Sequence, residues 1–202
     1  MTFSIDEYLQ DKFPTLKLES PLFYNAAIGL RFEIGNPDPS VSDEKYREQV
    51  RFRSTELFKN THNDNDDIYI VLYLYLNRKH GKTHKLNVFR KGVKNKRVLR
   101  NLSCESIVHS DEEDEDWESY RYVLKCKVSD IKSLTFLFAD YSLFFINTTN
   151  HTIFYFYDSR GLDIVSNSKE ALQETFLKYN HWILDYDREK MNSVFLSKNY
   201  IS

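Results

Sequence analysis

The sequence predicts an α+β fold, with a largely antiparallel β-sheet packed with N-terminal, middle and C-terminal helices. Three observations support this prediction. Segments with the periodicity of β-strands outnumber helical segments and do not alternate with them in a regular way. Aromatic residues make up 15% of the chain, which is enough for a well-packed core. With only 5 Gly and 4 Pro among 202 residues, the sequence is not typical of a disordered chain, and we expect a single domain over residues 1–202.

The N-terminal segment carries signals for the start and the end of a helix. Ser4 can accept a hydrogen bond from the first helical turn, and Glu7 completes a Ser-x-x-Glu capping box. Pro14 ends the helix, because proline lacks the backbone donor and its ring clashes with the preceding turn. The segment has neither the basic region nor the apolar core of a signal peptide, so we expect a cytoplasmic protein.

A strand and a helix are expected next. Residues 28–35 (IGLRFEIG) alternate in polarity, so that the apolar side chains share one face and Arg31 and Glu33 share the other. From Asp43 to Lys59 the sequence has a modest apolar stripe, and acidic residues stand at its start, where a helix dipole favours negative charge. This pattern predicts a helix.

The middle and the last third of the chain hold most of the strands. Residues 68–76 (IYIVLYLYL) are apolar on both faces, which is typical of a strand in the middle of a sheet. The run is far shorter than the ~20 residues that span a bilayer, so we expect no membrane partner. Residues 120–128 alternate more clearly. Residues 142–147 and 152–158 are predicted to form a hairpin, and 162–166 a short further strand.

An amphipathic helix is predicted near the C-terminus. Either Asn167 or Ser168 can cap its start. A last helical turn is expected to begin near Asp187. The side chains at helical spacing that should line the inner face of the main helix are Leu172, Phe176, Tyr179 and Ile183.

Charge is distributed unevenly along the middle of the chain. Residues 68–104 contain no Asp or Glu, cations cluster within residues 78–100, and the acidic run DEEDEDWE follows at residues 111–118. A cationic cluster favours nucleic-acid binding, but a nucleic-acid-binding domain normally has a basic excess, and the net charge here is -2. We therefore expect a mobile, solvated charged segment around residues 78–118 and no nucleic-acid partner. Weak nucleic-acid binding through residues 78–100 stays open as an alternative.

Neither a cofactor nor a metal site is expected. His80 and His84 are four residues apart but have no third ligand nearby. Cys104 and Cys126 form no Cys-x-x-Cys pair, and we expect both to be structural thiols in a reducing compartment. The sequence also lacks a Gly-x-Ser-x-Gly motif and a glycine-rich phosphate loop.

The clearest group of candidate site residues lies in the stretch YDSRGLD near the C-terminus. Asp158 suits the first position of a turn, and Gly161 is expected to supply a positive φ. Turn chemistry does not explain Arg160, which suggests bidentate ion pairs between arginines and aspartates. We predict no catalytic residue and a structural or interaction network of Arg31, Glu33, Asp158, Arg160, Gly161, Asp163, Asp187 and Arg188.

The same residues carry a resemblance to a known family. RFEIG after the first helix, IYIVLYLY, and the long C-terminal tail resemble the domain-of-unknown-function family 3885 of Bacillus-type bacteria. The tail of that family is an aromatic strand that runs into a Y-D-x-R-G-x-D-I turn, then a helix and a W-I-x-x-Y-D-R segment. Leu162 stands where many members have Cys, which removes a thiol role at the turn. The resemblance covers most of the chain, is sharpest over its last third, and implies a fold but no activity. The matching positions are Tyr157, Asp158, Arg160, Gly161, Asp163, Ile164, Trp182, Ile183, Tyr186, Asp187 and Arg188.

These observations lead us to expect a non-catalytic cytoplasmic protein-binding module whose partner is another protein. An immunity-type protein that neutralises a toxin is the most specific form of this expectation. It is favoured by the missing catalytic motifs, by the tyrosine-rich strands and by the acidic run. The alternative is a metal-assisted hydrolase or nuclease that uses Asp158, Asp163 and Asp187.

Overall fold

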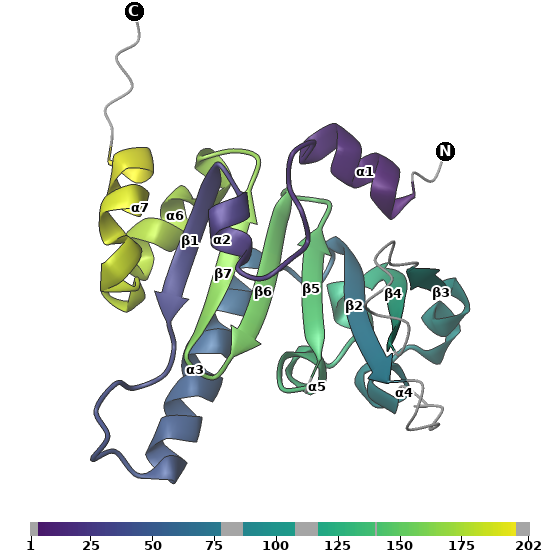
Figure 1. Ribbon diagram of the computed structural model, residues 1–202, viewed down its shortest axis with the longest axis horizontal. Helices are drawn as coiled ribbons and strands as arrows, with labels where there is room; N and C mark the ends of the chain where they lie inside the picture. The colour runs from purple at the N-terminus through teal and green to yellow at the C-terminus, as the bar shows by residue number, and fades with distance from the viewer. Residues whose placement is uncertain (1–3, 78–86, 108–116, 140, 197–202) are drawn as a thin grey trace, which may run out of the picture. The chain divides into compact units, whose positions relative to one another are not determined.

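The computed structural model describes residues 4–77, 87–107, 117–139 and 141–196 (Figure 1). The chain divides into two compact units. Unit 1 contains residues 1–63 and 150–202, and unit 2 contains residues 64–149. Within each unit the strands pair antiparallel, which confirms the predicted α+β class. The expectation of a single domain over the whole chain stays a prediction.

Unit 1 consists of three strands with helices on both faces. Its strands are β1 (Ile28–Glu33), β6 (Thr152–Asp158) and β7 (Gly161–Ser166), and β7 pairs with both of the others. Its helices are α1 (Ile5–Lys12), α2 (Leu22–Asn25), α3 (Asp43–Thr61), α6 (Glu170–Lys178) and α7 (Arg188–Phe195), with the 3-10 turns η5 (Asn180–Trp182) and η6 (Asp185–Asp187).

The two faces of the unit 1 sheet have different characters. On one face Leu30, Ile164 and Phe154 form a fully buried row across β1, β7 and β6. The α3 side chain Phe58 packs edge-on against Phe154, with ring centroids 5.4 Å apart. Figure 1 shows α3 behind the strands and α2 in front of them. The face under α2 is the one that carries Arg31.

The helix starts follow their local signals. Ser4 and Glu7 form the predicted capping box at the start of α1. At the start of α3, the Ser42 side chain accepts a hydrogen bond from the Lys45 N–H. The end of α3 lies two residues beyond the predicted end. One helix end differs from the prediction: α6 stops at Lys178 and does not continue to Ile183. The next residues form η5, where the rings of Tyr179 and Trp182 stack 4.8 Å apart. Packing of these aromatic rings therefore replaces the last helical turn.

Unit 2 is a four-stranded antiparallel sheet with short helices. The strand order is β5 (Ser142–Asn147), β2 (Asp67–Asn77), β4 (Trp117–Lys127), β3 (Leu102–Ile107). The helices are α4 (Asn87–Gly92) and α5 (Ser133–Leu137), and the 3-10 turns are η2 (Lys96–Asn101) and η4 (Val128–Asp130).

The sequence correctly predicts β2 as a central strand. It lies between β4 and β5, and Ile70 and Val71, which point to opposite faces, are both fully buried. Residues 87–107 were expected in the mobile charged segment, but they form α4, η2 and β3. The reason is burial, because Phe89 packs against Phe136 with ring centroids 5.6 Å apart. Residues 78–86 and 108–116 of that segment lie outside the described residues.

The helices of both units named above lie within the described residues. None of the helices found there combines the length and the apolar character that crossing a bilayer requires.

Candidate functional site

The centre of the candidate site is an ion pair between β1 and β7. Arg31 and Asp163 are directly opposite each other in the antiparallel register. The guanidinium Nε lies 2.7 Å from Oδ1 of Asp163, and Nη2 lies 2.9 Å from Oδ2. Asp163 is fully buried, and the backbone N–H of Phe23 in α2 also donates to Oδ2 at 3.0 Å. Each carboxylate oxygen therefore has a charged donor, which is what a buried carboxylate requires.

Asp187, the last residue of η6, approaches a different nitrogen of the Arg31 guanidinium from those that bind Asp163. Its Oδ2 is 3.7 Å from Arg31 Nη1, and its Oδ1 accepts a 2.8 Å hydrogen bond from the Tyr24 hydroxyl. The Asp187 side chain is buried, and Oδ2 has no hydrogen bond to any described residue. The hydrogen bond to Asp187 raises the pKa of Tyr24, and burial adds to this effect. Asp187 thus links α2 to the C-terminal helices.

Aromatic rings surround the Arg31 guanidinium. Its central carbon lies 4.6 Å from the ring centroid of Tyr24, 5.3 Å from that of Phe23 and 5.5 Å from that of Tyr157. Such cation–π contacts are favourable, especially where water is excluded. Burial tends to lower the pKa of Arg31, but its hydrogen bonds and charge interaction with Asp163 outweigh burial and raise it. Arg31 is consequently a fixed positive charge that holds several segments of unit 1 together.

Asp158 and Arg160 form a separate pair in the turn between β6 and β7. Asp158 Oδ1 accepts from the Arg160 backbone N–H at 2.7 Å, and Oδ2 accepts from Arg160 Nε at 2.9 Å. Burial raises the pKa of the Asp158 carboxyl, but the hydrogen bonds from Arg160 dominate and lower it. The Arg160 side chain is 82% exposed, so this pair lies at the surface. It neither contacts nor completes the Arg31 ion pair.

Gly161 has a different role from the predicted one. Its φ lies outside the positive range, so it does not provide a left-handed turn residue. A Cβ at this position would come within 2.8 Å of the Phe32 carbonyl oxygen and 2.0 Å of the Tyr157 hydroxyl oxygen. Glycine is therefore needed because β1 and the Tyr157 side chain approach the backbone closely.

Arg188 donates hydrogen bonds to oxygens of the η5–η6 segment and not to the carboxylate of Asp187. Its Nε donates to Asp185 Oδ1 at 2.7 Å and its Nη1 donates to Asn180 Oδ1 at 2.9 Å. Its Nη2 donates to the Ile183 carbonyl at 3.2 Å. Arg188 therefore fixes the η5–η6 segment, while Asp187 turns toward Arg31.

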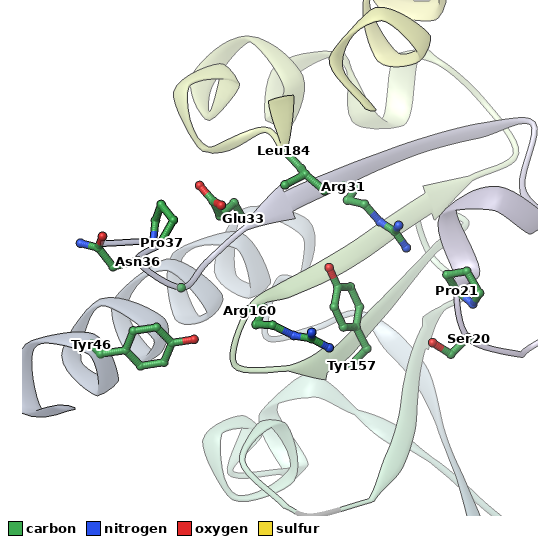
Figure 2. Close-up of a pocket in the computed structure, with 11 residues that line it drawn as sticks. Ser20, Pro21, Arg31, Glu33, Asn36, Pro37, Tyr46, Tyr157, Arg160 and Leu184 are labelled. Atoms are coloured by element: carbon green, nitrogen blue, oxygen red, sulfur yellow. The ribbon is translucent and has the colours of Figure 1, made fainter. Parts of the chain in front are cut away.

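A hollow of about 620 Å³ lies beside the Arg31 cluster and is formed by unit 1 alone. Figure 2 shows Tyr157 between the guanidinium groups of Arg31 and Arg160, while Tyr46 enters from α3. We call this hollow the β1 pocket. Its lining residues are Ser20, Pro21, Arg31, Glu33, Gly35, Asn36, Pro37, Tyr46, Tyr157, Arg160 and Leu184.

Two polar groups of the β1 pocket lack partners among the described residues. The Tyr157 hydroxyl makes no hydrogen bond there, and burial, followed by the charge of Asp163, raises its pKa to about 12. It is therefore a neutral donor at physiological pH. The Glu33 carboxylate makes no ion pair there either, because Arg53 donates to the Glu33 backbone carbonyl at 2.8 Å. The sequence did not predict that Tyr157 lines a pocket. The only available signal was its spacing of two residues from Tyr155, which puts both side chains on one face of β6.

The three acids of the hydrolase alternative do not share one open site. Asp158 binds Arg160, while Asp163 and Asp187 both face Arg31. Over the described parts of the chain, no group of three or more His, Cys, Asp or Glu side chains is arranged to hold a metal ion. An arginine stands where a divalent cation would have to bind the two buried carboxylates.

The basic stretch belongs to unit 2. Residues 78–86, which include His80 and His84, and residues 111–116 of the acidic run lie outside the described residues. The remaining cations of the stretch are on or beside α4 and η2, where Lys96 Nζ donates to the carbonyls of Arg90 and Val93. The exposed cations that make no ion pair with a described acid are Arg90, Lys91, Lys94, Lys96, Arg97 and Arg100.

Comparisons with known proteins place the chain in a family. No solved structure matches it. The chain is similar to the uncharacterized protein YnaE of Bacillus subtilis (strain 168), with 24% identity over 208 residues that cover 89% of this chain and 96% of that protein. The family model described as "Domain of unknown function (DUF3885)" matches residues 5–187. Because this match spans most of the chain, the protein belongs to the DUF3885 family.

Proposed function

We propose that the protein is a non-catalytic cytoplasmic binding module whose partner is another protein. The observation that carries the proposal is that the buried carboxylates of Asp163 and Asp187 are already held by neighbouring side chains. Asp163 is held by both donors of Arg31 and by a backbone N–H, so neither of its oxygens is available to take a proton from a substrate. Asp187 is held by Tyr24 and faces the same arginine. The cluster supports a structural role.

Exposed aromatic side chains of unit 1 support a protein partner. Tyr186 in η6 is 86% exposed, and Tyr24 in α2 is 46% exposed. Phe52 in α3 is 60% exposed and packs edge-on against Trp182, with ring centroids 5.9 Å apart. Aromatic residues are enriched in the buried centres of protein interfaces, where they provide a large apolar area with few rotatable bonds. We use the name aromatic surface for the exposed side chains of Tyr24, Phe52 and Tyr186, which come from three separate elements, α2, α3 and η6.

An immunity-type protein that neutralises a toxin is the most specific form of this proposal. Proteins of this kind act by occupying a surface of the partner and need no chemistry of their own. The acidic run at residues 111–118 would speed the approach of a basic partner through long-range attraction.

The proposal is tested by chemical cross-linking in the native host, with variants of the aromatic surface. Tyr186→Ala and Phe52→Ala should abolish the cross-link to a partner. Tyr75→Ala is the matched control, because Tyr75 is a similarly exposed aromatic residue (57%) of unit 2. For the immunity form, co-expression should restore growth to cells that produce the captured partner. Cross-linking that is equal in all three variants would contradict the proposal, as would turnover of a substrate.

One observation favours a second candidate function, the binding of a nucleic acid by unit 2. The α4–η2 segment presents six exposed cations without ion pairs to described acids, and the buried Phe89 packs it against Phe136 of α5. Clustered cations gain affinity for phosphates by releasing counterions. Binding to a single-stranded RNA should then weaken steeply as salt increases, and reversal of Arg97 and Arg100 to Glu should reduce this salt dependence. Undetectable or salt-independent binding would exclude this function.

A further inference from the structure

The β1 pocket has opposite charges at two positions along one strand. Glu33 and Arg31 are two residues apart on β1 and both line the pocket, so their side chains leave the same face of the strand. Their Cα atoms are about 6–7 Å apart for an extended chain. In Figure 2 the Glu33 carboxylate and the Arg31 guanidinium point in opposite directions along the pocket. The pocket therefore has an acidic end and a basic end.

At the basic end the Tyr157 hydroxyl has no acceptor among the described residues, whereas Arg31 is ion-paired with both Asp163 and Asp187. Arg31 uses Nε and Nη2 for Asp163, while Nη1 makes no hydrogen bond to a described residue and is 3.7 Å from Asp187 Oδ2. Arg160 keeps Nη1 free of Asp158. A partly buried hydroxyl such as that of Tyr157 normally has a hydrogen-bond partner in a folded protein. A carboxylate oxygen is the acceptor that arginine and tyrosine donors bind best.

At the acidic end, Arg53 interacts with the Glu33 carboxylate through its charge but makes no direct ion pair with it. The Glu33 carboxylate makes no ion pair with the described residues, because the Arg53 guanidinium is directed to the Glu33 carbonyl and to the Trp182 ring, 5.4 Å from its centroid. The ring of Tyr46 also lines the pocket, but its hydroxyl donates to the Ser159 carbonyl at 3.0 Å, next to Arg160. A carboxylate is suited to an ammonium group, which donates charge-assisted hydrogen bonds to it.

Apolar side chains line the pocket between its ends. Pro21, Pro37 and Leu184 contribute to the walls. The volume of about 620 Å³ is within the range of about 300–1,000 Å³ that is usual for small-molecule sites. The walls therefore suit a short methylene chain that connects two polar ends.

We infer that the β1 pocket binds an amino-acid-like ligand, with its ammonium group at Glu33 and its carboxylate at Arg31, Tyr157 and Arg160. The spacing of the charged ends favours a ligand whose amino group and carboxylate are separated by several methylene groups. Either a free amino acid or a peptide that ends in lysine carries this chemistry. The inference concerns the β1 pocket and is independent of the aromatic surface, so either proposal can fail without the other.

The test is a chain-length series measured by isothermal titration calorimetry with the full-length protein. The probes are ω-amino acids from glycine to 6-aminohexanoate, together with the matched carboxylic acids and amines that carry one charge. Affinity should pass through a maximum with length, and the best zwitterion should bind at least about tenfold more tightly than either matched single-charge compound. A peptide with a C-terminal lysine forms a second arm, which distinguishes a free amino acid from a chain end.

Three variants check the assigned ends. Glu33→Gln should reduce the affinity for the best zwitterion about tenfold and leave that for the matched carboxylic acid unchanged. Tyr157→Phe removes one hydrogen bond to the ligand carboxylate, so the affinities for the zwitterion and for the matched carboxylic acid should both fall about 2- to 12-fold. Glu48→Gln is the control, because Glu48 is exposed on α3 and does not line the pocket. No binding at any chain length, or equal affinity in Glu33→Gln and the parent protein, would overturn the inference. Thermal melting of each variant verifies that it is folded.

Discussion

Arg31 and Asp163 meet side by side across two paired strands, although 132 residues separate them in the chain. Two hydrogen bonds, of 2.7 and 2.9 Å, join the guanidinium to the carboxylate. Because the pair is buried, water cannot replace either partner. The ion pair therefore ties the N-terminal strand β1 to the C-terminal strand β7 in one fixed register.

Removal of one partner from this pair should strongly destabilise the protein. Arg31→Met leaves a buried carboxylate without its charge partner, and we expect the free energy of unfolding to fall by about 3–5 kcal/mol. Urea unfolding followed by circular dichroism measures the loss. In Arg31→Met/Asp163→Leu the only buried charge left in this cluster is Asp187, which keeps its hydrogen bond from Tyr24, so part of the stability should return. If the two substitutions were additive, the ion pair would not be the cause.

The surface pair Asp158–Arg160 should behave in the opposite way. Arg160 is 82% exposed, and the bond from its backbone N–H to Asp158 does not depend on the side chain. Exposed ion pairs contribute little to stability, because water and salt compete with them. Arg160→Ala should therefore leave the melting temperature unchanged within error. A large decrease would show that the turn pair, and not the Arg31 pair, organises this end of the sheet.

Gly161→Ala tests the close approach of the strands. The added methyl would lie 2.8 Å from the Phe32 carbonyl oxygen and 2.0 Å from the Tyr157 hydroxyl, and we expect a loss of about 1–3 kcal/mol in urea unfolding. In a Tyr157→Phe background the loss should be smaller, because the closest of the three contacts, that with the hydroxyl, is removed while the ring carbon Cζ at 2.7 Å remains. An equal loss in both backgrounds would assign the requirement to the Phe32 carbonyl and the Tyr157 ring.

The two cysteines should differ in reactivity toward a thiol reagent such as Ellman's reagent. Cys104 is exposed on β3, whereas Cys126 is buried on β4. Burial raises the pKa of Cys126 to about 12, so little of the reactive thiolate is present at pH 8. One thiol should react rapidly in the folded protein, and both should react in denaturant. Cys104→Ser is the control and should abolish the rapid phase. Rapid reaction of both thiols in the folded state would contradict the burial of Cys126.

Alkaline pH should destabilise the folded state through Tyr157. Burial and the charge of Asp163 raise its pKa from 10.0 to about 12, so between these values the folded state retains a proton that the unfolded state has lost. The unfolded state then binds fewer protons, and the free energy of unfolding falls as the pH rises from about 10 to 12. Urea titrations across this range measure the fall, and Tyr157→Phe should make it shallower. An identical slope in the variant would exclude Tyr157 as the cause.

Short-range signals predicted most of the secondary structure. The capping box of Ser4 and Glu7 requires only four consecutive residues, and it forms as expected. The apolar character of β2 on both faces likewise predicted its central position. Where long-range packing competes with local preference, the local signals predict less. Stacking of Tyr179 on Trp182 accompanies the early end of α6, and residues 87–107 contain α4, η2 and β3, while the mobility expected for that segment stays a prediction.

The sequence by itself determined the α+β class, the starts of α1 and α3, and the residues available for ion pairs. It identified Arg31, Asp163 and Asp187 but not how they combine. Only the tertiary structure decided that Arg31 lies between the two acids, and that Gly161 allows a close contact and does not provide a positive φ. The physical reason is range: caps and strand alternation depend on neighbouring residues, whereas ion-pair partners depend on which distant segments the strand register brings together.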